Sequence, residues 1–221
     1  MLNQQRLDEA TNFLYPFIDS KESDAGALLA DLTNSALAKA AESAALRRST
    51  LQSCAALITS AGAEMARRFI AGGRLFTFGN GGSSTDAATL AALFAQPPLA
   101  EPLPAWSLTA DQAVLTALGN DVGFDLVFAR QLIARARAAD IAVAMSTSGN
   151  SADLLLAMRE AHTRGIYTIG FTGYDGGAFV DNPDVDVCFV VRSQSVHRIQ
   201  ESQALLGYQL WAAVQAEKGL R

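Results

Sequence analysis

Two segments of the chain repeat the same order of an apolar run, a short polar loop and a helix. Leu75–Phe78 is followed by GNGGS (residues 79–83), and Ile141–Met145 is followed by STSGNS (residues 146–151). An unbroken apolar run is typical of a strand that is buried on both faces of a sheet. Strands that alternate with helices over residues 74–218 predict a three-layer α/β fold with a parallel sheet.

Both loops have the composition of an anion site. Glycine lets the backbone adopt positive φ and approach a ligand closely, and the first N–H groups of a helix have no internal partner. The second loop adds four hydroxyl groups at a helix N-terminus, more than a simple cap requires, and therefore predicts a phosphate site. For the first loop an ordinary strand-to-helix turn is the alternative, because it matches neither the G-x-x-x-x-G-K-[ST] nor the G-x-G-x-x-G pattern.

The other elements follow from helical spacing and from breaking residues. Residues 1–20 predict one short helix, in which Leu7, Ala10, Phe13, Leu14 and Phe17 are spaced to share a face. Residues 25–69, rich in alanine and leucine, predict two or three helices. Further strands are predicted at residues 106–109, 166–172 and 185–191, and further helices at residues 86–94, 111–118, 124–138, 152–163 and 195–218.

Composition excludes several classes of protein. The net charge of −5 argues against broad contact with nucleic acid, which requires a basic surface. Half of the residues are hydrophobic and 18% are charged, so we expect buried interfaces in a homo-oligomer. Cys54 and Cys188 form no CxxC unit, which excludes a zinc knuckle or a redox dithiol. Neither a signal peptide nor an apolar run of about 18 residues is present, so we expect a cytoplasmic protein without a membrane span.

Six short segments occur in an order that is characteristic of one family. The chain resembles the sugar isomerase (SIS) domain proteins and is most similar to the phosphoheptose isomerase group, including its relatives that associate with the bacterial replication initiator. The segments are GNGGS (79–83), LTAD (108–111), LGND (118–121), STSGNS (146–151), TGYDGG (172–177) and RIQE (198–201). The resemblance implies a flavodoxin-like SIS domain over residues 46–221, preceded by a helical extension over residues 1–45.

The resemblance also implies an assembly, a ligand and the residues that bind it. SIS proteins of this group form homotetramers with helices at the centre and hold a phosphorylated sugar at subunit boundaries. The positions that match the phosphate cradle are Ser83, Ser146, Thr147, Ser148 and Ser151. Asn80 and Asp111 match positions near the sugar.

The family's catalytic positions are altered in this chain. The family's isomerases convert sedoheptulose 7-phosphate to a heptose 7-phosphate by an aldose–ketose proton shuttle. Four residues supply the shuttle and also bind zinc: a His and a Glu on the helix after the glycine loop, and a Gln and a His on the last helix. The matching residues here are Thr89, Leu93, Gln200 and Tyr208, so only the Gln is kept. Leucine accepts no proton, and the four residues include no strong zinc ligand. We therefore predict no zinc cofactor and no isomerisation by the family's mechanism.

Other residues offer a replacement acid–base set. His197 lies one helical turn before Gln200, and Glu201 is adjacent, so the three can face one site. Alternatively, His197 packs at the start of the helix and Glu201 makes an ion pair; His162, the other histidine, is expected on a helix surface. Three functions stay open: a phosphosugar-binding sensor or scaffold for a protein partner, an isomerase with altered residues, or a purely structural assembly factor.

Overall fold

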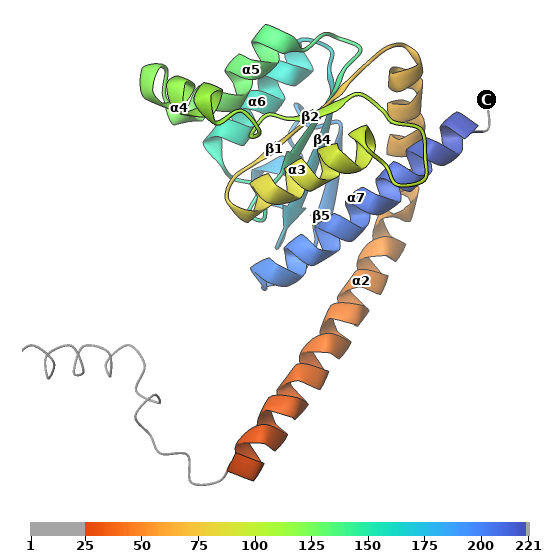
Figure 1. Ribbon diagram of the computed structural model, residues 1–221, viewed down its shortest axis with the longest axis vertical. Coiled ribbons are helices and arrows are strands. Elements are labelled where there is room, and N and C mark those ends of the chain that lie inside the picture. Colours follow the sequence, from red (N-terminus) through yellow and green to blue (C-terminus); the bar gives the residue numbers. More distant parts are fainter. Residues whose placement is uncertain (1–24, 220–221) are drawn as a thin grey trace, which may run out of the picture. The chain divides into compact units, whose positions relative to one another are not determined.

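The computed structural model describes residues 25–219 (Figure 1). The chain divides into two units, Met1–Ser43 and Ala44–Arg221. The domain boundary predicted after residue 45 stays a prediction. The short helix predicted over residues 1–20 lies outside the described residues. Within the first unit the described residues are helical, and four of their leucines, Leu28, Leu29, Leu32 and Leu37, are exposed.

A single helix, α2 (Ala25–Ile70), replaces the two or three helices predicted over residues 25–69. That prediction was wrong because the segment has no proline and only two glycines, Gly26 and Gly62, in a run dominated by good helix formers. Gly62 instead permits close packing against helix α7 (Val196–Gly219). A Cβ atom at Gly62 would come within 2.7 Å of the Ala213 Cβ.

Five parallel strands form one sheet among the described residues, in the order β2-β1-β3-β4-β5. The strands are β1 (Leu75–Gly79), β2 (Ala105–Ser107), β3 (Ile141–Met145), β4 (Tyr167–Gly173) and β5 (Val187–Val191). The helices between them are α3 (Gly82–Ala95), α4 (Gln112–Asp121), η1 (Phe124–Leu126), α5 (Val127–Arg135), α6 (Ala152–Thr163) and η2 (Gly177–Phe179). The predicted α/β fold with a parallel sheet is confirmed.

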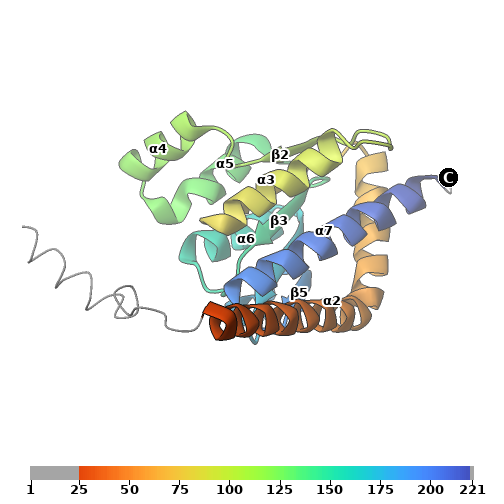
Figure 2. The same ribbon diagram turned by 60° about the horizontal axis from the view of Figure 1, so that its bottom comes forward.

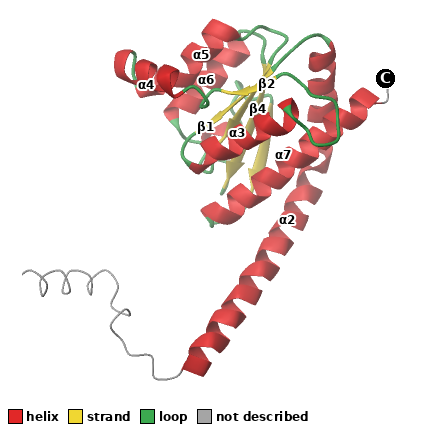
Figure 3. Ribbon diagram, in the orientation of Figure 1, coloured by secondary structure: helices red, strands yellow, loops and turns green. Residues whose placement is uncertain are grey.

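Two apolar cores, one on each face of the sheet, pack the strands against the helices. Side chains alternate along a strand, so Ile141, Val143 and Met145 of β3 face one core, and Ala142 and Ala144 face the other. The first core is completed by α3, α7 and the end of α2, the second by α5 and α6. Figures 1 and 2 show the helices on both sides of the sheet, and Figure 3 shows the strands between them.

Two helix ends differ from the predictions. Helix α3 begins at Gly82 instead of Asp86, because the preceding Gly81 adopts φ 53°, and the polar loop residues therefore form its first turn. The helix predicted over residues 124–138 begins with η1 and ends at Arg135. It ends early because the Asp140 carboxylate accepts the Arg137 N–H, which holds residues 137–140 in a turn.

The strand order places β1 beside β3, with Gly79 paired to Met145. Within the sheet, β2 and β3 are the two neighbours of β1 and lie on opposite flanks of it. The direction in which successive strands are added to the sheet therefore reverses between β2 and β3. Ligands of open parallel sheets bind beyond the carboxyl ends of the strands at such a point. The two polar loops that follow β1 and β3 therefore meet at this edge. None of the helices in residues 25–219 has the length and apolar character of a membrane span.

Candidate functional site

The loops after β1 and β3 line a cavity of about 90 Å³, which we call the cradle. All of the predicted binding residues except Asp111 contribute to it. Its lining residues are Asn80, Ser83, Met145, Ser146, Thr147, Ser148, Ser151 and Leu154. The N-termini of α3 and α6 both belong to these loops, so backbone N–H groups and hydroxyl groups are directed to one place, which suits a phosphate.

The backbone of the second loop is held in shape by the loop that follows β4. Gly149 adopts φ 68°, and a Cβ atom there would collide with the Gly176 carbonyl oxygen. The Gly149 N–H donates to the Ser146 Oγ at 2.9 Å, and the Asn150 Oδ1 accepts from the Ala178 N–H at 2.8 Å. Ser151 stands at the N-cap of α6 without a capping hydrogen bond from its side chain. The cradle is thus a formed backbone loop in which hydroxyl groups are available to a ligand.

Asp153 orients one cradle residue and was not predicted. Its side chain is buried, and both carboxylate oxygens accept from the Asn80 Nδ2, at 3.1 and 2.9 Å. Because the amide nitrogen is engaged in this way, the Asn80 Oδ1 is left as the acceptor for a ligand hydroxyl. An acidic residue in the first turn of the helix after a serine-rich loop was the signal in the sequence.

A second, smaller cavity adjoins the cradle, and we call it the side cavity. Its volume is about 60 Å³, and Met145 is part of the wall of both cavities. Its lining residues are Asp86, Thr89, Leu90, Leu93, Met145, Gln203, Ala204, Gly207 and Tyr208. Three of the four positions that match the family's catalytic set, Thr89, Leu93 and Tyr208, therefore lie together in this wall.

The residues of the side cavity do not fit a zinc ion. Leu93 has no donor atom, and the Thr89 Oγ1 donates to the Thr85 carbonyl oxygen at 2.9 Å. The Tyr208 ring lies against the Trp211 ring, with 5.4 Å between their centroids. Zinc sites are built from thiolates, imidazoles and carboxylates, of which this wall has Asp86 alone. Within residues 25–219, no three His, Cys, Asp or Glu side chains gather as a metal site.

Two polar residues of the side cavity were missed in the sequence. The Gln203 side chain is fully buried, and its Nε2 donates to the Ser146 carbonyl oxygen at 2.6 Å, while its Oε1 has no partner. The Asp86 Oδ2 is likewise buried without a partner, and this burial raises the pKa of the carboxyl group. Gln203 lies three residues after Gln200 on α7, so helical spacing was the signal that could have identified it.

The predicted replacement residues gather in an open depression beside the side cavity. His197, Gln200 and Glu201 line it together with Asp86 and Ala204. Gln200 also approaches the first turn of α3, because its Nε2 lies 2.5 Å from the position of a Cβ atom on Gly82. Glu201 forms an ion pair with Arg47 at 2.7 Å, which was the alternative to its catalytic role. The acid–base role of these residues stays a prediction.

Asp111 and His162 lie outside both cavities. The Asp111 Oδ1 accepts from the Val114 N–H at 3.1 Å and caps α4, and its Oδ2 lies 4.0 Å from Arg135. Its predicted place near the sugar stays a prediction. His162 is partly exposed near the end of α6, with its Nδ1 3.6 Å from Asp186, at the opposite edge of the sheet.

Known proteins are similar to this chain in sequence and in fold. The SIS domain family matches residues 40–173, which include both polar loops and strands β1 to β4. The chain belongs to the SIS domain family. Within this family it is related to phosphoheptose isomerases: that of Roseiflexus sp. (strain RS-1) is 43% identical over 158 residues, which cover 71% of this chain and 79% of the relative.

Solved phosphoheptose isomerases have the same SIS fold. The enzyme from Neisseria gonorrhoeae superposes with a TM-score of 0.75 at 35% identity, covering 84% of this chain and 99% of the other. The enzyme from Francisella tularensis superposes with a TM-score of 0.77 at 31% identity, covering 84% and 97%. The predicted family is thus confirmed. The family match ends before α7, the helix of this SIS protein that carries Gln200, Gln203 and Tyr208.

Proposed function

We propose that this SIS protein binds a phosphorylated sugar in the cradle, lacks the zinc-dependent isomerase reaction, and acts as a sensor or as a scaffold for a protein partner. The observation that carries the proposal is a cradle with its hydroxyl groups in place next to a side cavity walled by Thr89, Leu93 and Tyr208. Binding and chemistry use different residues in such a site, so one can be kept while the other is lost.

Phosphate binding is supported by the arrangement of donors. The cradle combines the N-terminal turns of two helices with hydroxyl groups from residues 83 and 146–151. Hydrogen bonds to a charged group are worth about 1.5–3 kcal/mol each, so a few of them hold a sugar phosphate at micromolar concentration. The relatives named above are phosphoheptose isomerases, which supports a phosphorylated sugar as the ligand.

The absence of isomerase chemistry is supported by the side chains at the catalytic positions. An aldose–ketose isomerisation needs a base at a carbon-bound proton, an acid at the neighbouring oxygen and a group that stabilises the enediolate. Leu93 supplies none of these, and Thr89 and Tyr208 each offer a hydroxyl group in place of an imidazole or a carboxylate. The loss of a positioned acid or base lowers the rate by about 10²–10⁴-fold each.

An isomerase with altered residues is the second candidate. The depression that contains Asp86, His197, Gln200 and Glu201 lies beside the cavities and includes groups able to move a proton. The Arg47–Glu201 ion pair counts against Glu201 as a free base. We rank this candidate second because Asp86, the carboxylate in the wall of the side cavity, can act as an acceptor for a ligand as well as a base.

Assembly is part of the proposal. We infer a homo-oligomer, with a tetramer as the expected state, in the cytoplasm. The support is the group of exposed leucines on α2 at residues 28, 29, 32 and 37, which are between 44% and 66% exposed. Exposed apolar side chains that gather on one helix mark an interaction surface. The alternative to a second copy of this chain on that surface is a different protein partner.

The test measures turnover and binding on one sample. Sedoheptulose 7-phosphate is assayed for isomerisation with and without added zinc, and its binding is followed by calorimetry. We expect binding without turnover, and a loss of affinity of about tenfold or more in Ser148→Ala. Ser60→Ala, which changes an exposed serine on α2, is the matched control and should bind like the parent chain.

Two results would overturn the proposal. Turnover that disappears in His197→Ala or Glu201→Gln would establish the altered isomerase. The absence of binding for every sugar phosphate tested, by a chain that stays folded, would remove the ligand and leave the structural assembly factor.

A further inference from the structure

The side cavity has two surfaces of different chemistry. Leu90, Leu93 and Met145 form an apolar wall, while Asp86 and Gln203 each present a buried oxygen without a donor. Among the described residues, the buried side-chain atoms without partners number six, and two of them are in this one cavity. A buried acceptor without a donor costs free energy in the unliganded protein, so its presence at a cavity indicates the group that a ligand supplies.

The orientation of Gln203 is fixed by its partner. The Ser146 carbonyl oxygen can only accept, so the side-chain atom 2.6 Å from it must be the amide nitrogen. The carbonyl oxygen of the Gln203 amide is then left as an acceptor. Since the Asp86 carboxylate also accepts, the polar side of the cavity is complementary to a ligand group that donates a hydrogen bond, such as an N–H group.

The cavity lies where a substituent of a bound sugar would enter it. Met145 is part of the wall of the cradle and of the side cavity, and Gln203 bonds directly to the backbone of the cradle residue Ser146. A sugar whose phosphate occupies the cradle can therefore reach past Met145 toward Leu90 and Leu93. The volume of about 60 Å³ is sufficient for a small substituent of a sugar.

We propose that the ligand is an N-acylated amino-sugar phosphate, and that the side cavity takes its acetamido group. The methyl group packs against Leu90 and Leu93, and the N–H group donates to Asp86 or Gln203. The acetamido carbonyl can accept from a hydroxyl group, and the wall offers that of Tyr208, because the Thr89 hydroxyl already donates to Thr85. A sugar hydroxyl in the same place would meet an acceptor but would leave the apolar wall unfilled. This inference rests on the proposed binding of a sugar phosphate in the cradle.

The test compares sugar phosphates that differ in the acetamido group. Calorimetry is carried out with N-acetylglucosamine 6-phosphate against glucose 6-phosphate, with N-acetylmannosamine 6-phosphate against mannose 6-phosphate, and with sedoheptulose 7-phosphate. We expect at least one acetamido compound to bind about tenfold or more tightly than its hydroxyl counterpart, the range for one small apolar group in a pocket. Equal affinities within each pair would overturn the inference while the proposed function stands. No binding of any compound would overturn both.

A variant locates the preference in the side cavity. Leu93→Gln replaces an apolar wall with an amide of similar size and should abolish the preference for the acetamido compound. Leu99→Gln, at a leucine that is 96% exposed, is the matched control and should keep the preference. If Leu93→Gln does not fold, methyl-labelled leucine in the parent chain gives a second measurement. Nuclear Overhauser contacts between the ligand's acetyl methyl and Leu90 or Leu93 are expected, and their absence in a saturated complex would contradict the inference.

Discussion

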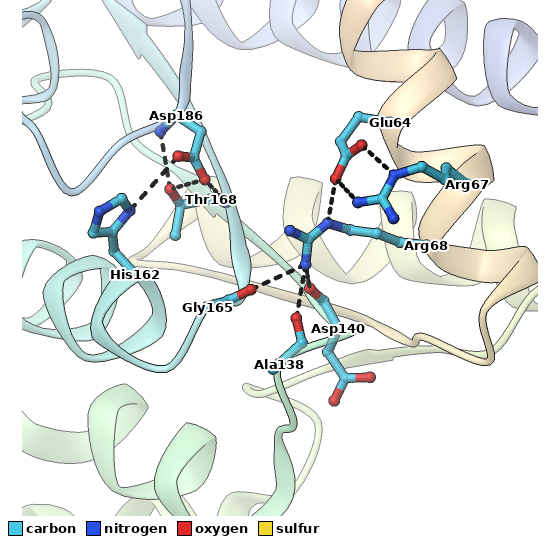
Figure 4. A network of polar contacts seen from close by, with 9 residues as sticks. All are labelled: Glu64, Arg67, Arg68, Ala138, Asp140, His162, Gly165, Thr168 and Asp186. Atoms are coloured by element: carbon cyan, nitrogen blue, oxygen red, sulfur yellow. Dashed lines mark hydrogen bonds and ion pairs between the residues drawn. The ribbon is translucent and has the colours of Figure 1, made fainter.

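The two edges of the sheet contain similar polar residues, but they differ in whether the buried polar atoms have hydrogen-bond partners. At the amino edge, drawn in Figure 4, the Arg68 Nη1 donates to the carbonyl oxygens of Ala138, Asp140 and Gly165, at 2.8, 3.1 and 3.1 Å. None of the nine residues in Figure 4 has a buried side-chain atom without a partner. At the carboxyl edge, the Asp86 Oδ2 and the Gln203 Oε1 are buried without partners.

This difference separates residues that stabilise the fold from residues that await a ligand. Arginine and aspartate side chains at the amino edge join the ends of α2, β3, β4 and β5, and their hydrogen-bonding groups are used within the chain (Figure 4). A buried polar group that lacks a partner lowers stability, and such groups persist where function needs them. We therefore expect changes at the amino edge to alter the free energy of unfolding, and changes at the carboxyl edge to alter ligand affinity.

The largest expected effect is at the amino edge. Asp140→Ala removes a buried carboxylate that accepts from the N–H groups of Arg74 and Arg137 and from the Arg74 guanidinium at 2.8 Å. The partners would be left without an acceptor, so we expect a loss of about 3–5 kcal/mol in the free energy of unfolding, measured by urea titration.

Asp125→Ala, at an exposed aspartate, is the control and should change stability by less than about 0.5 kcal/mol. The affinity of the folded Asp140→Ala chain for a sugar phosphate should stay within about twofold of the parent. A loss of stability below about 1 kcal/mol, or a large change in affinity, would contradict the contrast between the two edges.

Much of the fold and of the cradle could be predicted from the sequence, whereas the contrast between the two edges could not. Apolar runs and glycine-rich turns identified the strands of the sheet, and the hydroxyl groups of residues 146–151 identified the cradle, because both patterns are local. The single helix α2 was missed although a local signal for a continuous helix was present, because the segment has no proline and only two glycines. The roles of Asp86, Asp153 and Gln203 depend on which helices meet beyond the strands, and this was known only from the structure.

A smaller effect is expected at Asp86. Burial raises the pKa of this carboxyl group in the folded chain, so its ionisation destabilises the folded state. Stability is therefore lost as pH rises from the unfolded-state pKa of about 4 through the raised pKa of the folded state. Asp86→Asn removes that charge and should stabilise the unliganded chain at pH 7 by up to about 1 kcal/mol, a figure reduced for solvent screening because the group is only partly buried.

The Asp86→Asn gain should shrink as pH falls toward 4, where the parent carboxyl group is protonated, and urea titrations at pH 7, 5.5 and 4 measure it. Calorimetry on the same variant should show weaker binding of the ligand. If the variant were less stable than the parent at pH 7, Asp86 would belong with the satisfied residues of the amino edge, and the contrast would fail at its central residue.

The smallest effect is expected from Glu64, on the last turns of α2. Hydrogen bonds from Arg67 and then Arg68 lower the pKa of its carboxyl group to about 2, against the opposing effect of burial. The ion pairs therefore contribute fully above the ordinary glutamate pKa of about 4.5 and are lost as pH falls toward 2. Because the Arg67 side chain is 58% exposed, Glu64→Gln should cost only about 0.5–1 kcal/mol at pH 7.

The Glu64→Gln cost should narrow between pH 5 and pH 3 in urea titrations. Glu160→Gln, which breaks the ion pair with Arg164 on α6, is a matched control outside the network of Figure 4. If both variants cost the same at every pH, the connection of Glu64 through Arg68 to three carbonyl oxygens adds nothing to an ordinary helix ion pair. A larger, pH-dependent cost at Glu64 alone would show that the amino edge is stabilised as a network, in which each group depends on its neighbours.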